Sequence, residues 1–303
     1  MRAILPAAQW TLANGDGRVG AYVSKPFGFS TSSYWIEGPT GLILIDTQFL
    51  PSAAEELVLW AEKVTGKKAV LAVVLHPNPD KFNGTETLQK RGIRVVTSRQ
   101  VLDRIAPVHE LRSKWFGNRY KLDYPATTPA PEAFGEATTV LAAAGIEIRL
   151  HVLGFGCSAA HVAATYDGHL FTGDLVSNNT HAWLEIGQIG AWLQRLAELK
   201  ALEPDHVHPG RGPSAGPELL DAQAAYLREV QALVVAERSR QPVGQRKADD
   251  EAGIERVRQQ MVARYPAHDY PIFLALGLPA VWRLTHEAEI RSRPAPAPGE
   301  KPK

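Results

Sequence analysis

The first half of the chain contains short apolar runs, separated by polar turns, that are typical of buried strands. The run at 42–47 is apolar almost throughout, which indicates a central strand, and it follows the strand-like segment 33–37 across a turn at 38–41. Two further runs, at 71–75 and 93–97, alternate with helix-like segments and give the order β-β-α-β-α-β. This order favours an α/β fold built in layers.

The first predicted helix opens near Pro51. Ser52 and Glu55 have the three-residue spacing of a capping box, so Ser52 is expected to cap the helix. Gly66 is expected to end it, because glycine favours the left-handed conformation that follows a helix C-terminus. One apolar face is predicted from Leu57, Trp60 and Ala61. A second, short helix is expected at about 84–91.

Residues 104–135 show no clean period and contain aromatic residues among prolines and basic residues. We expect a long loop here that acts as a lid or as a pocket wall, because loops of this length inside a compact domain are usually functional or mobile. The alternative is a surface excursion with a small aromatic cluster of its own. The aromatic residues concerned are Trp115, Phe116, Tyr120 and Tyr124.

The segment 137–176 returns to the pattern of strands. Apolar and polar residues alternate over 146–152, which predicts a strand with one wet face. Asp167-Gly168 lies between two apolar runs and is a strong hairpin signal. A helix at about 187–202 and a short strand at 205–208 are expected next.

After Gly216 the pattern is helical, and Leu220, Leu227 and Val230 fit one helix face. We expect a helical appendage that could dimerise or cover a cleft. Its predicted helices span about 217–239, 249–264 and 270–288. The predicted organisation is a domain at 1–215, a helical extension at 216–290 and a disordered, proline-rich tail at 291–303.

Composition excludes some classes of protein but does not indicate a specific function. The 303 residues are 45% hydrophobic and 21% charged, with a net charge of +1, so no nucleic-acid partner is expected. A single cysteine rules out an internal disulfide. No run reaches the length of a membrane span, and no signal peptide is recognised. We therefore expect a cytoplasmic protein whose partner is a small molecule.

A dense polar loop follows the apolar run 71–75. It carries His76, Asn78, Asp80 and Lys81, and its backbone is broken by two prolines. Polar residues at the end of a buried strand mark the edge of an open α/β sheet where ligands usually bind. These side chains are candidate metal ligands, acids, bases or charge partners.

The order His-x-Asn-x-Asp-Lys resembles the His-x-His-x-Asp-His signature of the metallo-β-lactamase superfamily. Five features occur in the order of that superfamily and cover about residues 20–215: Leu44-Ile45-Asp46-Thr47, the His76 loop, Gly154-Phe155-Gly156-Cys157-Ser158, Phe171-Thr172-Gly173-Asp174 and Pro209-Gly210-Arg211-Gly212-Pro213. The resemblance implies an αββα sandwich with its site along one edge, here with added C-terminal helices. Function must be argued from the site itself, because one fold hosts many activities.

The resemblance also implies a two-metal site, usually of zinc, that this sequence matches only in part. Three positions keep a ligand-type residue: His76, Asp80 and Asp174. Four positions where relatives have histidine are occupied here by Asn78, Lys81, Cys157 and Arg211.

The first metal position would contain His76, Asn78 and Cys157. Imidazole and thiolate are good zinc ligands, whereas a neutral amide oxygen is a poor one. We therefore expect no cofactor, or one zinc ion at most, bound by His76 and Cys157.

The second metal position would contain Asp80, Lys81, Asp174 and Arg211. Ammonium and guanidinium groups have no lone pair to offer a metal. They supply two positive charges beside two carboxylates, and unpaired buried carboxylates would be costly. We therefore predict a salt-bridge cluster of these four residues in place of the second metal.

Plainer structural roles are expected for several of these residues. His76 could be a strand-end histidine bonded to backbone, and Cys157 a small buried hydrophobe or a nucleophile with His76 or His161 as base. His161 is otherwise expected to be structural, and Asp46 and Asn83 to hold loops, Asp46 either as a buttress of the metal loop or as a simple strand-end turn.

Other residues near the motifs are less informative. His181, His206 and His208 could reach the cleft, although each is more often a satisfied surface histidine. Ser158 lacks the context of a nucleophile elbow, which argues against a serine hydrolase.

Three functions fit the sequence. The first is a protein that lacks a two-zinc site and acts as a pseudoenzyme or small-molecule binder. The second is a hydrolase of an ester, lactone or thioester that uses one zinc ion at His76 and Cys157. The third is a metal-independent enzyme in which Lys81, Arg211 and His76 act on an anionic substrate.

Overall fold

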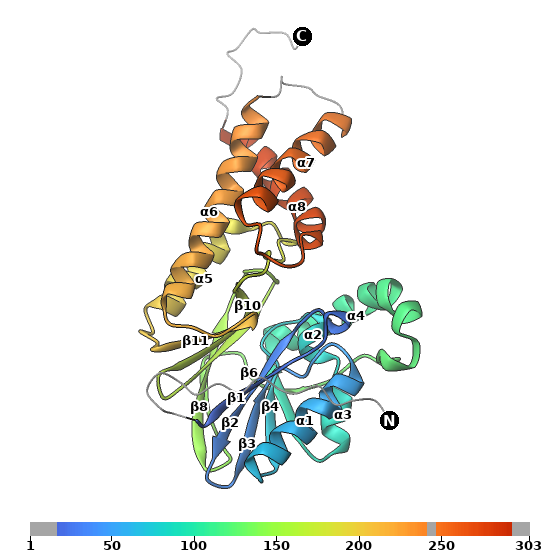
Figure 1. The fold of residues 1–303 in the computed structure, drawn as a ribbon, viewed down its shortest axis with the longest axis vertical. Helices are drawn as coiled ribbons and strands as arrows, with labels where there is room; N and C mark the ends of the chain where they lie inside the picture. The colour runs from blue at the N-terminus through green and yellow to red at the C-terminus, as the bar shows by residue number, and fades with distance from the viewer. Residues whose placement is uncertain (1–16, 241–246, 293–303) are drawn as a thin grey trace.

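Two β-sheets form the centre of the protein in a computed structural model that describes residues 17–240 and 247–292 (Figure 1). The first sheet has the strand order β1 (Val19–Val23), β2 (Ser32–Gly38), β3 (Gly41–Ile45), β4 (Ala69–Val73), β5 (Arg94–Ser98) and β6 (Glu132–Gly135). The second has the order β11 (His206–Arg211), β10 (His169–Ser177), β9 (His161–Tyr166), β8 (Ile146–Leu153) and β7 (Thr139–Ala143).

The two sheets pack against each other through one apolar cluster. Ile43 and Val95 of the first sheet belong to the same cluster as Ile148 and Leu150 of the second, and all four are fully buried. The alternation predicted at 146–152 is confirmed, because Glu147 and Arg149 are exposed between these buried residues. Burial on both faces explains why β3, and β4 from Leu71 onward, appear as continuous apolar runs.

Helices cover the outer faces of both sheets (Figure 1). The first sheet is flanked by α1 (Pro51–Thr65), α2 (Pro79–Phe82), α3 (Thr85–Lys90) and α4 (Arg99–Tyr120), and the second by α5 (Ile189–Lys200) and α6 (Glu218–Ser239). The predicted αββα sandwich is confirmed. The hairpin at Asp167-Gly168 is also confirmed, because β9 and β10 pair antiparallel from Tyr166 and His169 onward.

Residues 99–120 correct the prediction of a long loop, because they form the 22-residue helix α4. Its N-terminus is capped by the Ser98 hydroxyl, which accepts a hydrogen bond from the Val101 amide. Its buried side includes His109 and Arg112, so the sequence lacks a clean apolar period. Pro107 lies inside the helix, where it removes one backbone hydrogen bond without ending it.

The capping prediction at α1 is wrong, although the predicted end at Gly66 is confirmed. The helix begins at Pro51, so Ser52 lies within its first turn. The Ser52 hydroxyl instead donates a hydrogen bond to the Asp123 carboxylate, 2.6 Å away. This contact ties α1 to the segment that follows α4.

The C-terminal helices α6, α7 (Lys247–Arg264) and α8 (Ile272–Ser292) match the three predicted helices closely. They share one apolar cluster with α5 and with buried residues of β10, such as Leu170 and Leu175. The division at residue 215 stays a prediction. Helix α8 includes residues 291 and 292, which were expected in the disordered tail, and 293–303 lie outside the described residues.

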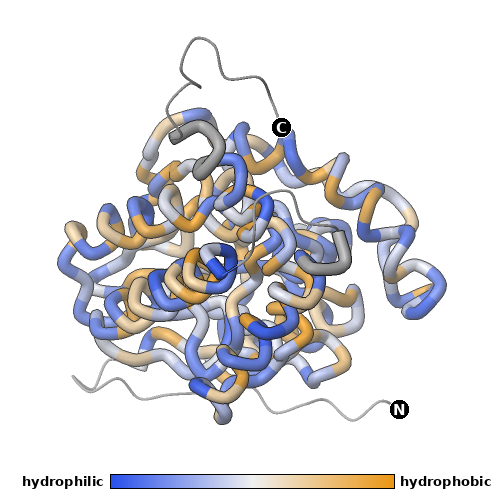
Figure 2. Tube along the Cα trace, turned by 90° about the horizontal axis from the view of Figure 1, so that it is seen from above, coloured by the Kyte–Doolittle hydropathy of each residue, from blue (hydrophilic) through white to orange (hydrophobic). Residues whose placement is uncertain are grey.

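Hydrophobic and hydrophilic segments alternate along the helices, as expected for helices with one apolar face (Figure 2). Within the described ranges, no helix combines the length and apolarity needed to cross a bilayer.

Candidate functional site

The polar loop and the matching motifs meet at one edge of the sandwich. Asp80 and Lys81 lie on the short helix α2, just after β4, whereas Asp174 lies within β10 and Arg211 ends β11. Strands β10 and β11 are parallel neighbours, so residues far apart in the sequence reach the same place. All four side chains are buried.

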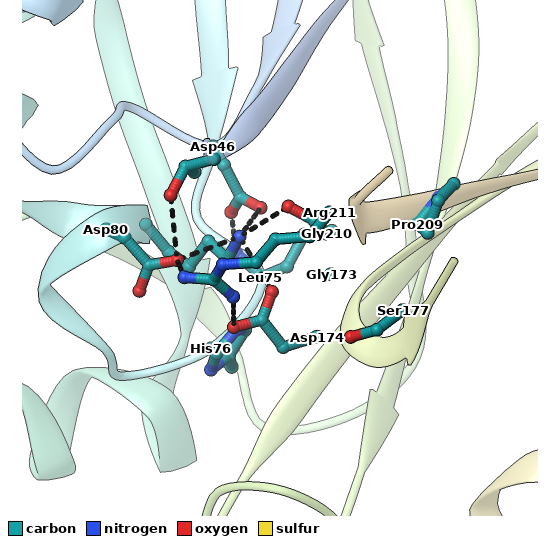
Figure 3. A network of polar contacts seen from close by, with 12 residues as sticks. Asp46, Leu75, His76, Asp80, Gly173, Asp174, Ser177, Pro209, Gly210 and Arg211 are labelled. Carbon is teal, nitrogen blue, oxygen red and sulfur yellow. Dashed lines mark hydrogen bonds and ion pairs between the residues drawn. The ribbon is translucent and has the colours of Figure 1, made fainter. Parts of the chain in front are cut away.

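Arg211 bridges the two aspartates (Figure 3). Its Nη1 donates to Asp174 Oδ2 at 2.5 Å, and its Nη2 donates to Asp80 Oδ2 at 2.6 Å. Its Nε donates to the backbone carbonyl of Phe29 at 3.1 Å. The guanidinium group is thus held on three sides, and its orientation is fixed.

Lys81 supplies the second positive charge. Its Nζ lies 2.9 Å from Asp174 Oδ1, 3.1 Å from Asp80 Oδ2 and 3.4 Å from the Gly210 carbonyl oxygen. The predicted salt-bridge cluster is therefore present, with two cations and two carboxylates in mutual contact. Because unpaired buried charges are costly, this pairing is what allows four ionised groups to share a buried site.

The cluster controls the protonation of its members. Burial alone would raise the pKa of Asp80, but Lys81 and Arg211 hold it below its usual value. Burial would also raise the pKa of Asp174, but Arg211 and Lys81 hold it well below its usual value. Burial would lower the pKa values of Lys81 and Arg211, but the aspartates raise both, so the cations stay charged.

Asp46 supports the loop from behind, as expected. Its Oδ1 accepts a hydrogen bond from the Leu75 amide at 2.8 Å, which holds the chain just before His76 (Figure 3). Burial raises its pKa to about 8, and Lys81, 4.0 Å away, only partly opposes this. Asn83 also holds a loop, because its amide donates to the Phe49 carbonyl oxygen at 3.0 Å.

A second, neutral cluster contains His76, Cys157 and His161, whose ligand atoms all lie within 4.8 Å of one another. Cys157 Sγ lies 3.7 Å from His161 Nε2, and that nitrogen also accepts a hydrogen bond from the Ser158 amide at 3.0 Å. His76 Nδ1 lies 3.1 Å from Ser158 Oγ, and its Nε2 lies 3.7 Å from Asp174 Oδ2.

Burial keeps this second cluster uncharged. It lowers the pKa of His76 to about 4 and that of His161 well below the usual value for histidine. It raises the pKa of the Cys157 thiol well above its usual value. From the sequence, His161 was paired with Cys157 only as a possible base and was not placed at the metal position, although it lies four residues after Cys157, where β9 begins.

The two clusters differ in their fitness for a metal. Lys81 and Arg211 fill the second position with cations that have no lone pair, so the residues there do not fit a metal. At the first position two imidazoles and a thiol are gathered, and His76 Nε2 has no hydrogen-bond partner within the described residues. These donors fit one zinc ion if Cys157 loses its proton and His161 Nε2 releases the Ser158 amide.

A cavity of about 320 Å³ opens beside the charged cluster. Asp80, Asp174 and Arg211 contribute to its wall, as does Asn78, which stands outside both clusters. The rest of the lining is largely aromatic and comes from α4, α8 and the loops near them: Phe29, Phe49, Trp115, Phe116, Trp183 and Phe273. Helix α4 is thus the pocket wall that was expected of this region, although the lining from α8 was not predicted.

Three other histidines lie away from this edge. His181 Nδ1 is bonded to the Tyr226 hydroxyl of α6 at 2.9 Å. His208 Nδ1 is bonded to Ser214 Oγ at 2.7 Å, and its ring stacks on those of His169 and Phe171. Neither His181 nor His208 lines the cavity, and His206 stacks on His169.

The sequence model of the metallo-beta-lactamase superfamily matches residues 26–211, more than half of the chain. The protein belongs to the metallo-β-lactamase superfamily. The match spans both clusters and four of the five motifs that carried the resemblance, and it ends at Arg211 within the fifth. No curated protein sequence matches the chain.

Solved structures of metallo-β-lactamases are similar in fold. One from Pontibacter korlensis is 20% identical, with a TM-score of 0.56 over 73% of this chain and 99% of its own. FIM-1 from Pseudomonas aeruginosa, in a mono-zinc form, is 17% identical, with a TM-score of 0.55 over 74% of this chain and 96% of its own. At these identities the likeness concerns the fold alone.

Proposed function

We propose that this superfamily member does not use a two-zinc centre and instead binds a small molecule in the aromatic cavity beside the charged cluster. The observation that carries the proposal is the bridging of Asp80 and Asp174 by Arg211. Lys81 completes the pairing, so the two carboxylates have the positive charge that a divalent ion would have supplied. The nucleophile of two-zinc hydrolases is a water molecule bound to the metal centre. With cations at the second position, no second metal ion would be available to bind such a water.

The cavity supports a binding role. Its volume lies at the low end of the range of about 300 to 1,000 Å³ that is typical of small-molecule pockets. Arg211 contributes to its wall and stacks on Phe273, with the guanidinium carbon 5.2 Å from the ring centroid. The charged cluster therefore fixes the shape of one wall of the pocket, which is a structural reason to retain it without a metal.

A second candidate is the hydrolase with one zinc ion. It is favoured by the approach of His76, Cys157 and His161, which is closer to a three-ligand site than the sequence suggested. A third, metal-independent enzyme would need Lys81 and Arg211 to bind an anionic substrate. It has less support, because both cations already have carboxylate partners.

Metal content separates the first two candidates. Tag-free protein should be measured by elemental mass spectrometry as purified, and again after zinc incubation and desalting. We expect less than about a tenth of a zinc ion per chain in both samples, because a buried neutral thiol and engaged imidazole disfavour binding.

A zinc content near one per chain that is lost in Cys157→Ser would contradict the proposal and establish the mononuclear site. His151→Gln is the matched control, because His151 is a partly buried histidine outside both clusters, bonded to Thr165. Zinc that persists in Cys157→Ser but falls in His151→Gln would identify adventitious binding.

A further inference from the structure

The chemistry of the cavity walls indicates what kind of molecule it accepts. Phe29, Phe49, Phe116, Trp183 and Phe273 present ring faces and edges, so most of the lining is apolar. The Phe29 ring contacts three of the others, those of Phe49, Phe116 and Phe273. Such walls favour a flat or chain-like apolar body, since burial of apolar surface is the main source of affinity.

The charged cluster adds no net charge to this cavity. Its two cations and two carboxylates neutralise one another. The charge preference of the pocket must therefore come from other residues. Two further arginines line it, Arg112 and Arg119, and both belong to α4.

Arg112 is buried, with 3% of its surface exposed. Its Nη2 pairs with Glu185, but its Nη1 has no hydrogen-bond partner within the described residues. The guanidinium contacts two aromatic rings, with its carbon 4.2 Å from the Trp115 centroid and 5.4 Å from that of Trp183. A buried donor without an acceptor, fixed beside a cavity, is suited to an acceptor from a ligand.

Arg119 lies seven residues further along α4, almost two turns, and therefore on nearly the same face. It is exposed, and no acidic partner for it exists in the part of the chain that the structure describes. Arg112 is balanced by Glu185, so Arg119 gives this end of the cavity a net positive charge.

The mouth of the cavity is also apolar. Trp115, Ile272 and Leu276 are 45%, 54% and 45% exposed, and all three line the cavity. Single exposed apolar side chains are common, but three around one opening extend the apolar wall outward.

We propose that the cavity binds a small monocarboxylate with an aromatic or similarly apolar body. Its carboxylate accepts hydrogen bonds from Arg112 and Arg119, and its body lies against the aromatic wall formed by Phe29, Phe116 and Phe273. This inference rests on the proposed binding function and adds the class of ligand. Arginine is the natural partner for it, because the guanidinium donors match carboxylate geometry.

The test uses the full chain and three probes with the same apolar body: 4-phenylbutyrate, 4-phenylbutan-1-ol and 4-phenylbutylamine. Isothermal titration calorimetry gives each Kd. A change in the intrinsic fluorescence of the seven tryptophans, of which Trp115 and Trp183 line the cavity, accompanies its occupancy. We expect the acid to bind at least tenfold more tightly than the alcohol, and the amine to bind most weakly.

Arg119→Gln should weaken binding of the acid about three- to tenfold and leave the alcohol unchanged. Arg104→Gln is the matched control, because Arg104 is an exposed arginine of the same helix that does not line the cavity. Arg112→Gln should weaken the acid further, with its fold checked by circular dichroism. Arg119 is exposed, so Arg119→Gln should fold. The test therefore remains decisive even if Arg112→Gln fails to fold.

Equal binding of the acid and the alcohol would overturn the carboxylate inference and leave the proposed binding function intact. Failure of the acid to bind at 10 mM, or equal effects of Arg119→Gln and Arg104→Gln, would also overturn it. The zinc measurement tests the proposed function separately, so failure of one is distinguishable from failure of the other.

Discussion

The two metal positions of the superfamily are filled in this protein by clusters of opposite character. At the second position four ionised side chains neutralise one another through contacts of 2.5 to 3.1 Å. At the first position an uncharged thiol and two uncharged imidazoles lie within 4.8 Å of one another. Every charged group of the second position has an ion-pair partner, whereas His76 Nε2 and His161 Nδ1 have no hydrogen-bond partner in the described part of the chain.

The difference follows from the charge of the residues that remain. Asp80 and Asp174 cannot stay buried and ionised without positive charge, so cations must stand where a metal would. Histidine and cysteine have neutral forms at ordinary pH and can be buried without a counter-charge. Loss of a metal therefore requires compensating cations at a site of carboxylates, whereas a site of neutral ligands requires none.

The strongest test of this comparison is to break the charged cluster. Arg211→Met leaves Asp80 and Asp174 with one cation between them, so we expect the free energy of unfolding to fall by about 3 to 5 kcal/mol. Urea unfolding measured at pH 7 gives this value. Arg94→Met is the control: Arg94 pairs with Glu132 at an exposed site, where loss of the pair should cost no more than about 0.5 kcal/mol. A similar small change in both variants would contradict the role given to Arg211.

Acid should act on the two clusters in different pH ranges. The buried histidines lose stability as the pH falls below the ordinary histidine pKa of about 6.5, whereas the charged cluster responds below about pH 4. The pKa values of Asp80 and Asp174 are lowered in the folded protein, so the unfolded chain binds protons first as the pH falls. Their stabilisation is full above the ordinary aspartate pKa of about 4 and is lost below it. We expect the double variant Asp174→Asn/Arg211→Met to lose less stability between pH 5 and pH 3 than the wild type, measured by urea unfolding. Cys157→Ala should keep the wild-type pH slope, and an unchanged slope in the double variant would refute the assignment.

The contrast between the clusters was partly visible in the sequence. Asp80, Lys81, Asp174 and Arg211 could be paired because the resemblance to the superfamily placed them at one metal position and buried charge requires partners. Strands β3 and β4 were evident as apolar runs between turn residues. Local pattern was sufficient for the strands, and the resemblance together with charge balance was sufficient for the cluster.

Other features depend on packing that no local pattern encodes. Helix α4 was missed because His109 and Arg112 occupy its buried face, where the helical period requires apolar residues. The imidazole of His161 reaches Cys157 because the chain bends before β9, where the Ser158 amide donates a hydrogen bond to His161 Nε2. The cavity brings Phe29 and Phe273 together from opposite ends of the described chain, and sequence separation conceals such contacts.

The neutral cluster should respond more weakly than the charged one. Cys157 is buried but makes no ion pair, so Cys157→Ala should cost about 1 to 2 kcal/mol, as expected for a small buried substitution. Urea unfolding should give the same cost with and without a chelator if no metal contributes. A cost that appears only in the absence of chelator would show that a bound metal stabilises this position.

The smallest expected effect concerns the contact that joins the neutral cluster to its surroundings. Ser158 Oγ lies 3.1 Å from His76 Nδ1, and removal of the hydroxyl leaves that ring nitrogen buried without its partner. We expect Ser158→Ala to lower the free energy of unfolding by about 1 kcal/mol, the usual value of one buried hydrogen bond. Ser239→Ala removes an exposed hydroxyl that is bonded to the Val235 carbonyl, and should change stability by less than about 0.5 kcal/mol.

Equal effects of Ser158→Ala and Ser239→Ala would mean that His76 is positioned by Asp174, 3.7 Å away, and therefore by the charged cluster. His76 would then belong to both clusters, and the neutral cluster would not be independent of the charged one.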